Sequence, residues 1–358
     1  MKCKIFLTEM GWGPIIRQSS IANELVKRGV NFTVQSNKNL DIIRKFFPKN
    51  TKIIERSNLI RFYSTKDGKL DYLKTKKHYK NYQKYLNKWF DENSDDLDYD
   101  FFISDMCPEA LQLGFKYNIP SFAICHFTWD WYFQQIIPLS ISNEILDLWK
   151  KYQKKATKFY FPPFTPKTIL DTYQKKKLTN FILSHKISKI KSNPKVKMDK
   201  IKILFLDSGD KIHTKQLKKI IIDNKDNNKF KLYHPDNFGN FANTISINSK
   251  KFLGKYIQKV DIVIGRAGFN TITEVMYYKK PSIFLSSQNN PEINWNLAKI
   301  ISADLSQSMD ADYLSKNFSS IIFDFLKYHA RNKILNISKS KFKFDGHKEI
   351  CNDIIRNL

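Results

Sequence analysis

The sequence is poor in cysteine and arginine, and it has no apolar run long enough to span a bilayer. Its four cysteines are scattered and form no CxxC pair, so neither a zinc site nor a disulfide framework is expected. Such cysteine usage is typical of the reducing cytoplasm. Only a few apolar residues precede Glu9 at the N-terminus, which indicates a first strand and not a signal peptide.

The net charge of +27 suggests contact with nucleic acid or with an anionic surface. Almost all of this charge comes from lysine, however, and the arginine forks that recognise phosphates and bases are few. No specific nucleic-acid partner is therefore expected. A peripheral contact with an anionic membrane, at its inner face, remains open.

A length of 358 residues favours two domains, and 42% hydrophobic residues supply enough apolar area for two cores. The opening segment runs from a strand over Lys4–Leu7 through a glycine turn, Gly11–Pro14, into a helix and a second strand. This order is typical of a doubly wound α/β sheet whose ligand crevice lies at the carboxyl ends of the strands. The turn lacks GxGxxG, so no dinucleotide site is expected.

Two later strands of this first domain end in polar residues. One ends at Ser104 and Asp105, and the next is followed by His126, Thr128 and Asp130. Because carboxyl ends of parallel strands share one edge, these side chains should meet in one crevice. His126 is a candidate general base, and the alternative is a structural hydrogen-bonding role in the crevice wall.

Residues 69–98 combine lysines with aromatic residues at helical spacing. They predict a surface helix docked on the core through its aromatic side chains, or alternatively a basic aromatic patch that faces an anionic lipid or polymer. The proline-rich segment Phe161–Pro166 suits an interdomain connection. A helical piece is expected near Leu178–Ile190. The expected domains are therefore 1–165 and 166–340, followed by a C-terminal helix in 341–358 that packs back on the first domain.

The second domain has one stretch that stands out, Asp261–Glu274. It combines a β-branched strand, a turn flanked by Gly265 and Gly268, and a helix start that Asn270 or Thr271 can cap. A helix N-terminus behind a glycine turn favours phosphate, because its amides and dipole attract anions. The simpler alternative is an ordinary strand, turn and helix. Two further strand ends, at Ser208/Gly209 and at Ser287–Glu292, should face the same crevice.

This stretch, followed by Lys280-Pro281, resembles the donor-binding motif of GT-B-fold glycosyltransferases, in particular those similar to the N-acetylglucosaminyltransferase of peptidoglycan synthesis. The resemblance implies two Rossmann-like domains facing a cleft. It places Glu274 at the donor ribose, and Gly268, Asn270 and Thr271 at the phosphates. Gln288–Asn296 looks like the family segment ending Glu-Gln-x-x-Asn-Ala, with Ile293 at the Gln position. The full set of implied donor residues is Ser208, Gly209, Gly265, Arg266, Gly268, Asn270, Thr271, Glu274, Gln288, Glu292 and Asn296.

The first domain is similar to predicted glycosyltransferases and to the glycosyltransferase-like half of arabinokinases. Their opening loop reads Gly-x-Gly-His with an arginine three residues on. Here Gly11, Gly13 and Arg17 match, and Pro14 replaces the histidine. The resemblance implies that Asp105, Glu9 or His126 substitutes as the base, or that no base is needed there.

The function expected from these patterns is transfer of a sugar from a nucleotide donor, of UDP type, to a hydroxyl group of a glycan, lipid or small-molecule acceptor. No metal and no cofactor beyond the donor is expected, because Arg266 or Arg17 can neutralise the leaving diphosphate. Two alternatives are a nucleotide-sugar 2-epimerase and a non-catalytic protein that binds sugar nucleotides or an anionic polymer.

Overall fold

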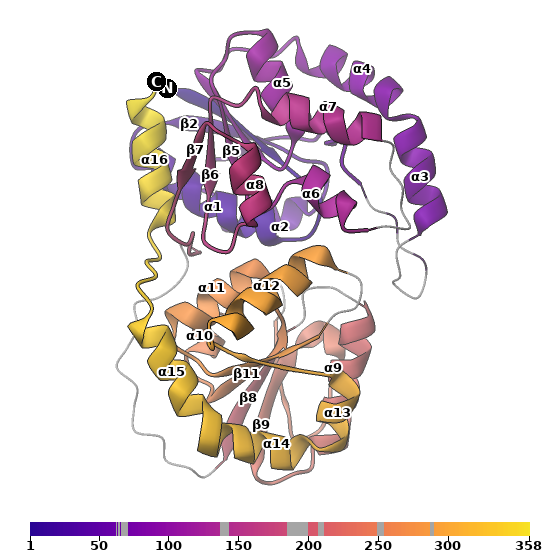
Figure 1. Ribbon diagram of the computed structural model, residues 1–358, viewed down its shortest axis with the longest axis vertical. Coiled ribbons are helices and arrows are strands. Elements are labelled where there is room, and N and C mark those ends of the chain that lie inside the picture. The colour runs from indigo at the N-terminus through magenta and orange to yellow at the C-terminus, as the bar shows by residue number, and fades with distance from the viewer. Residues whose placement is uncertain are drawn as a thin grey trace. The chain divides into compact units, whose positions relative to one another are not determined.

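The computed structural model describes residues 1–61, 63, 65, 71–136, 143–184, 200–206, 211–248, 254–286 and 290–358, without the side chains of 211–213. The chain divides into two compact units (Figure 1). Unit 1 comprises Met1–His185 together with Lys343–Leu358, and unit 2 comprises Lys186–Phe342.

Unit 1 is built on a seven-stranded sheet in the order β3-β2-β1-β4-β5-β6-β7, and every neighbouring pair is parallel. The order reverses between β1 and β4, where Leu7 pairs with Asp105 at the carboxyl ends of both strands. Open α/β sheets bind ligands at such a switch point. The elements of unit 1 are β1 (Lys2–Leu7), α1 (Gly13–Val26), β2 (Asn31–Gln35), α2 (Leu40–Phe46), β3 (Lys52–Ile54), α3 (Tyr72–Lys80), α4 (Tyr82–Asn93), β4 (Phe101–Asp105), α5 (Pro108–Lys116), β5 (Ser121–Ile124), α6 (Trp129–Gln134), α7 (Asn143–Gln153), β6 (Lys158–Phe161), α8 (Lys167–Thr172), β7 (Lys176–Leu178) and α16 (Gly346–Arg356).

Unit 2 repeats this architecture with a six-stranded parallel sheet in the order β10-β9-β8-β11-β12-β13. Its central strands β8 and β11 are almost wholly buried, as the short β-branched runs predict. The elements of unit 2 are β8 (Ile201–Leu206), α9 (Lys211–Asn224), β9 (Phe230–Pro235), the 3-10 turn η2 (Asp236–Phe238), β10 (Ile245–Ile247), α10 (Gly254–Ile257), β11 (Ile262–Arg266), α11 (Phe269–Tyr277), β12 (Ser282–Leu285), α12 (Pro291–Ser302), β13 (Gln307–Met309), α13 (Ala311–Lys316), α14 (Phe318–Asp324), the π-helical turn η3 (Phe325–His329) and α15 (Ala330–Lys339).

The proline-rich segment does not connect the units. It follows β6 inside unit 1, and residues 166–184 belong to that unit as well. The predicted helix near Leu178–Ile190 is wrong over its described part, because Leu178 ends β7 and Ile182 forms a bridge with Asp345. The sequence hides β7 because this strand is three residues long and two of them are lysines, so it shows no apolar run.

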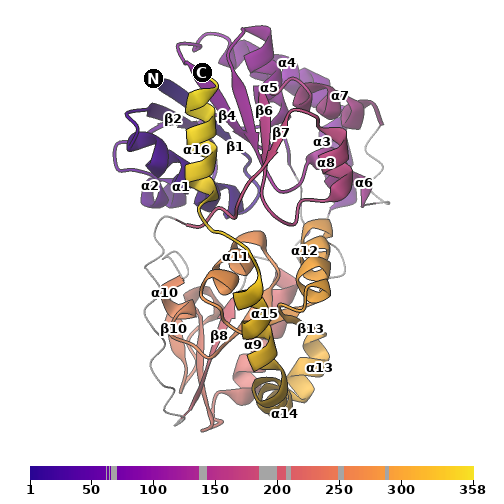
Figure 2. The same ribbon diagram turned by 60° about the vertical axis from the view of Figure 1, so that its left-hand side comes forward.

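The C-terminal helix α16 is part of unit 1, where it lies against α1 (Figure 2). Asp353 anchors it by accepting hydrogen bonds from Lys158 Nζ and Tyr160 Oη, each at 2.8 Å, and from Lys177 Nζ at 3.0 Å. These donors outweigh the effect of burial and hold the pKa of Asp353 at about 2. At the start of α16, a Cβ on Gly346 would lie 2.2 Å from the carbonyl oxygen of Asn180, so this junction requires glycine.

Candidate functional site

The turn between β11 and α11 in unit 2 contains two glycines with different roles. A Cβ on Gly265 would lie 2.4 Å from the carbonyl oxygen of Leu206 on the neighbouring strand. Gly265 is therefore needed for close packing of β11 on β8, and not for approach to a ligand. A Cβ on Gly268 would meet only Thr271 Oγ1, at 3.8 Å. Gly268 thus borders open space at the N-terminus of α11.

The N-cap residue of α11 is Gly268, which has no side chain with which to cap the helix. The first-turn amides of a helix have no intrahelical acceptor, and together with the dipole they form a site for an anion. Asn270 and Thr271 are partly buried residues of this first turn. Arg266, at the end of β11, is partly buried as well. The structure thus brings four of the predicted donor residues together around one turn.

Glu274 is the sixth residue of α11, the helix that begins at this turn. Its carboxylate has no hydrogen bond or ion pair with any described residue, although the side chain is partly buried. Burial alone raises the pKa of Glu274 to about 8. Keeping an uncompensated acid in such surroundings costs stability, which is expected where a ligand supplies the missing partners.

Helix α12 supports the turn from the side. Asn296 is fully buried and donates from Nδ2 to the carbonyl oxygen of Ala267 at 3.1 Å, while its Oδ1 has no partner among the described atoms. Glu292 lies partly buried in the first turn of α12. The sequence analysis overlooked Asn290, whose Oδ1 caps α12 by accepting from the Ile293 amide at 3.1 Å. Ser208, Gly209 and Gln288 lie outside the described residues.

The two glycines provide a matched pair of variants. We expect Gly265→Ala to lower the free energy of unfolding by about 2 kcal/mol or more, because a backbone carbonyl cannot move aside. Gly268→Ala should leave stability within about 0.5 kcal/mol, since open space receives the methyl group. If phosphate approaches the turn, the same methyl group should weaken nucleotide binding. Chemical denaturation and nucleotide titration of both variants check this pair. Equal stability loss in both would contradict it.

In unit 1, Asp105 and Arg17 form a buried bidentate ion pair. Arg17 donates from Nη2 to Oδ1 at 2.7 Å and from Nε to Oδ2 at 2.9 Å, and Gln18 Nε2 donates to Oδ2 at 2.8 Å. The side chains of Arg17 and Asp105 are 2% and 0% exposed. Charge-assisted forks of this kind are strong and geometrically fixed. Asp105 is therefore committed to holding α1 on the carboxyl end of β4.

His126 joins the same network. Its Nδ1 lies 3.4 Å from Arg17 Nη1, and the ring is buried. Because guanidinium nitrogens only donate, Nδ1 acts as the acceptor and the proton of the neutral ring resides on Nε2. The structure thus brings Asp105 and His126 together through Arg17, which contacts both.

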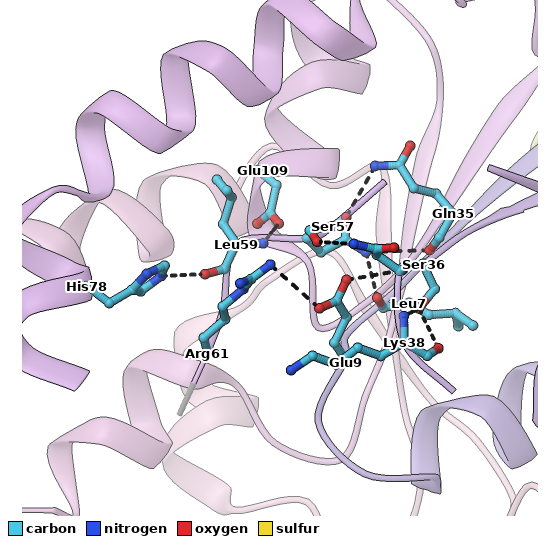
Figure 3. A network of polar contacts seen from close by, with 12 residues as sticks. Leu7, Glu9, Gln35, Ser36, Lys38, Ser57, Leu59, Arg61, His78 and Glu109 are labelled. Atoms are coloured by element: carbon cyan, nitrogen blue, oxygen red, sulfur yellow. Dashed lines mark hydrogen bonds and ion pairs between the residues drawn. The ribbon is translucent and has the colours of Figure 1, made fainter. Parts of the chain in front are cut away.

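Glu9 lies apart from this network, directly after β1. Its Oε1 accepts from the Asn37 amide at 3.1 Å, and its Oε2 lies 3.8 Å from Arg61 Nη2 without a hydrogen bond (Figure 3). Gly11 of the following loop has a φ of +73°, which a glycine adopts without strain, and Gly13 is the first residue of α1. The neighbouring Trp12 is 39% exposed.

Glu109 is a buried acid that the sequence analysis missed. Its Oε1 accepts from the Leu59 amide at 3.0 Å, and its Oε2 has no partner among the described atoms (Figure 3). Burial raises its pKa to about 7, more than that amide lowers it. An acidic residue behind a proline at a helix start looks like an ordinary capping residue in the sequence, so no local signal distinguishes it.

Neither a metal-ion cluster nor a membrane-spanning helix is found among the described residues. No three His, Cys, Asp or Glu side chains gather there as a cluster for a metal ion. Within the same residues, no helix combines the length and apolar character needed to cross a membrane.

Comparison with known proteins places this geometry in a fold class. The chain resembles the glycotransferase of kitacinnamycin (TM-score 0.70, 12% identity, covering 100% of this chain and 99% of that chain). It also resembles MurG of Acinetobacter baumannii (TM-score 0.60, 13% identity, 100% and 99%) and the spinosyn rhamnosyltransferase SpnG complexed with thymidine diphosphate (0.65, 10%, 100% and 100%). The chain therefore has the GT-B fold, and the predicted fold class and resemblance are confirmed.

One protein-family model matches part of the sequence, and the match lies within unit 2. Residues 196–316 match the Glycosyltransferase family 28 C-terminal domain, and this stretch contains the β11–α11 turn and Glu274. No curated protein sequence matches the chain. The similarity of the first domain to arabinokinases stays a prediction.

Proposed function

We propose that the protein transfers a sugar from a nucleotide-sugar donor to a hydroxyl group of an acceptor. The observation that carries this proposal is Glu274, a partly buried carboxylate without a partner among the described residues, on the helix that follows an open glycine turn. A ribose diol supplies the two donors that this carboxylate lacks. The donor diphosphate then lies at the uncapped N-terminus of α11. The match of this region to a glycosyltransferase domain supports the same assignment.

The chemistry follows from these positions. The acceptor hydroxyl oxygen forms the new bond to the sugar carbon, and the bond from that carbon to the diphosphate breaks with its electron pair. Arg266 and the α11 amides stabilise the negative charge of the leaving diphosphate, so the proposed reaction requires no metal ion. Of the three candidate bases we favour Glu9, because Asp105 and His126 are engaged with Arg17.

We further propose a UDP-linked hexose or N-acetylhexosamine as the donor and a role in glycan or cell-envelope synthesis. The likeness to a MurG protein and to a rhamnosyltransferase complexed with a pyrimidine diphosphate supports this finer assignment.

A thermal-shift panel of UDP, TDP, GDP and CMP and their sugars tests the proposal. We expect UDP and its sugars to raise the melting temperature by several degrees at about 100 times Kd, where a bound ligand adds about 2.7 kcal/mol of stability. Glu274→Ala should abolish the shift. A panel without any shift would overturn the proposal.

One observation favours a second candidate, a non-catalytic protein that binds sugar nucleotides. Two of the three candidate bases, Asp105 and His126, are engaged in the Arg17 network, and Pro14 stands where the related proteins have the histidine. Donor hydrolysis or transfer by the purified chain excludes this candidate. Nucleotide binding without either activity would support it.

A further inference from the structure

The segment Asn58–Arg61 of unit 1 is held at four points by buried side chains. Asn58 Nδ2 donates to the carbonyl oxygen of Leu7 at 2.6 Å, which places the segment over the carboxyl end of β1. Leu59 donates its amide to Glu109 at 3.0 Å, and its carbonyl oxygen accepts from His78 Nε2 at 3.0 Å. Figure 3 shows these contacts converging on one short stretch of chain.

The fourth point fixes the backbone of Arg61 itself. Tyr79 Oη accepts from the Arg61 amide at 3.2 Å and donates to the Arg61 carbonyl oxygen at 3.2 Å. Tyr79 is buried and packs edge to face against Phe133 and Trp149, so its ring cannot follow a moving loop. The backbone of Arg61 is therefore fixed on both sides of its Cα.

The carboxyl groups of Glu109 and Glu9, which lie around this segment, lower the stability of the fold because they are buried. Glu109 is completely buried and has no cationic partner, and the side chain of Glu9 is 0% exposed. Buried acids without full hydrogen bonding destabilise a fold. A loop that only needed closing would use apolar contacts. The arrangement indicates that the placement of this segment serves a ligand.

The guanidinium of Arg61 is the group that the segment presents. It is 32% exposed, and its contact with a described partner is the ion pair to Glu9 at 3.8 Å, with no hydrogen bond from its five N–H donors to any described residue. Arg17 differs in each respect, because it is 2% exposed and makes a bidentate pair. Arg61, not Arg17, therefore has donors available at the carboxyl edge of unit 1.

Tyr63, two residues after Arg61, packs against side chains of α3. Lys74 Nζ lies 4.9 Å from the centre of the Tyr63 ring, and the same ring contacts His78 edge to face. Asp71 uses its carboxylate to cap α3 at the Lys74 amide. Among the described residues, Glu9 is the acid that an ion pair joins to Arg61, while Glu109 holds the backbone two residues before it.

We propose that Arg61 binds an oxyanion, a phosphate or a carboxylate, on the acceptor, and that Glu109 and Tyr79 are positioning residues for it. This inference rests on the proposed transferase function for the identity of the ligand as an acceptor. A planar guanidinium with unused donors recognises such groups bidentately. The acceptor class is thus an acidic or phosphorylated compound and not a neutral alcohol.

Arginine labelling of the full chain with phenylglyoxal, read residue by residue through peptide mass spectrometry, tests the inference without requiring turnover. The probes are glucose 6-phosphate, glucuronate, glucose and inorganic phosphate. Arg44 is the matched control, because it is 61% exposed on the same unit and ion-paired at 3.2 Å to Glu55. We expect glucose 6-phosphate or glucuronate to slow labelling of Arg61 roughly tenfold relative to Arg44, and glucose to have no effect.

Three outcomes would overturn the inference: equal responses of Arg61 and Arg44, protection by glucose, or protection by inorganic phosphate alone, which would indicate an adventitious ion only. A second variant addresses selectivity. Arg61→Lys keeps the charge and loses the fork, so KM for acidic acceptors should rise about tenfold with kcat and nucleotide affinity unchanged. A proportional loss for neutral acceptors would contradict it. Because labelling needs no donor, its result is separate from the nucleotide panel that tests the proposed function.

Discussion

Replacing Glu274 by glutamine is expected to abolish nucleotide binding and at the same time to stabilise the native protein at pH 8. In the proposed donor site, the carboxylate accepts two hydroxyl donors of a ribose, whereas the uncharged amide offers one oxygen and turns its NH2 group toward the other hydroxyl. Loss of one charge-assisted bond and a mismatch at the second should weaken binding about 100-fold or more. Binding and stability therefore change in opposite directions at one residue.

The stability gain has a defined pH dependence. The ordinary pKa of a glutamate is 4.5, and in the native protein that of Glu274 is about 8. The unfolded chain loses this proton above pH 4.5, while the native protein retains it until pH 8, so native stability falls across this window. Glu274→Gln removes the effect. Its advantage over wild type should grow from near zero at pH 4.5 to about 2–4 kcal/mol at pH 8.

Melting temperatures of both proteins from pH 5 to 8, together with UDP titration, check this prediction. Glu109→Gln is the matched control, because the pKa of Glu109 is also raised, to about 7, but the residue lies in unit 1. It should show the same trend, complete by pH 7, with nucleotide affinity unchanged. A Glu274→Gln protein that still binds UDP normally would remove Glu274 from the donor site.

Replacing Asp105 by alanine is expected to cost about 3–5 kcal/mol of the stability of unit 1. The change leaves Arg17 charged and buried, and two of its N–H groups lose their acceptor. It also removes the acceptor of the Gln18 side chain. Removing one partner of a buried ion pair is far more damaging than removing both. The double variant Arg17→Met with Asp105→Leu should therefore recover much of the loss.

Urea unfolding followed by tryptophan fluorescence measures this effect, because five of the six tryptophans lie in unit 1 and one, Trp295, lies in unit 2. Asp130→Ala provides a comparison within the same edge of the sheet, since Asp130 accepts from Gln153 and Tyr173 but has no cationic partner in the described part of the chain. An Asp105→Ala protein of normal stability that lacks transferase activity would instead identify Asp105 as a base.

The sequence predicts most of both sheets because each central strand is a short apolar run that ends at a polar or glycine turn. β11 with its turn and α11 illustrates this, and the same holds for β1 and β4. The short strands β6 and β7 escape prediction. Their places are determined by pairing with β5 and with each other, and not by their own composition.

The candidate sites are less predictable, because the state of a polar side chain depends on distant partners. Asp105 looks like a base at a strand end, yet its partner Arg17 lies 88 positions away in the sequence. Gly265 and Gly268 look equivalent in the motif, and only the proximity of Leu206 separates packing from an open approach. The raised pKa of Glu109 results from its burial in the folded unit, which the local sequence does not show.

The assignment of α16 to unit 1 has a consequence for biosynthesis. Unit 2 is one uninterrupted stretch of chain, whereas unit 1 requires Lys343–Leu358, which are made after all of unit 2. Domains usually fold in the order of their synthesis. Here the later unit has all its residues first, and the earlier one must wait on the ribosome with the α1 surface around Ile21 and the Lys158 and Lys177 side chains uncovered. Unit 1 can therefore complete its fold only after all of unit 2 has been synthesised.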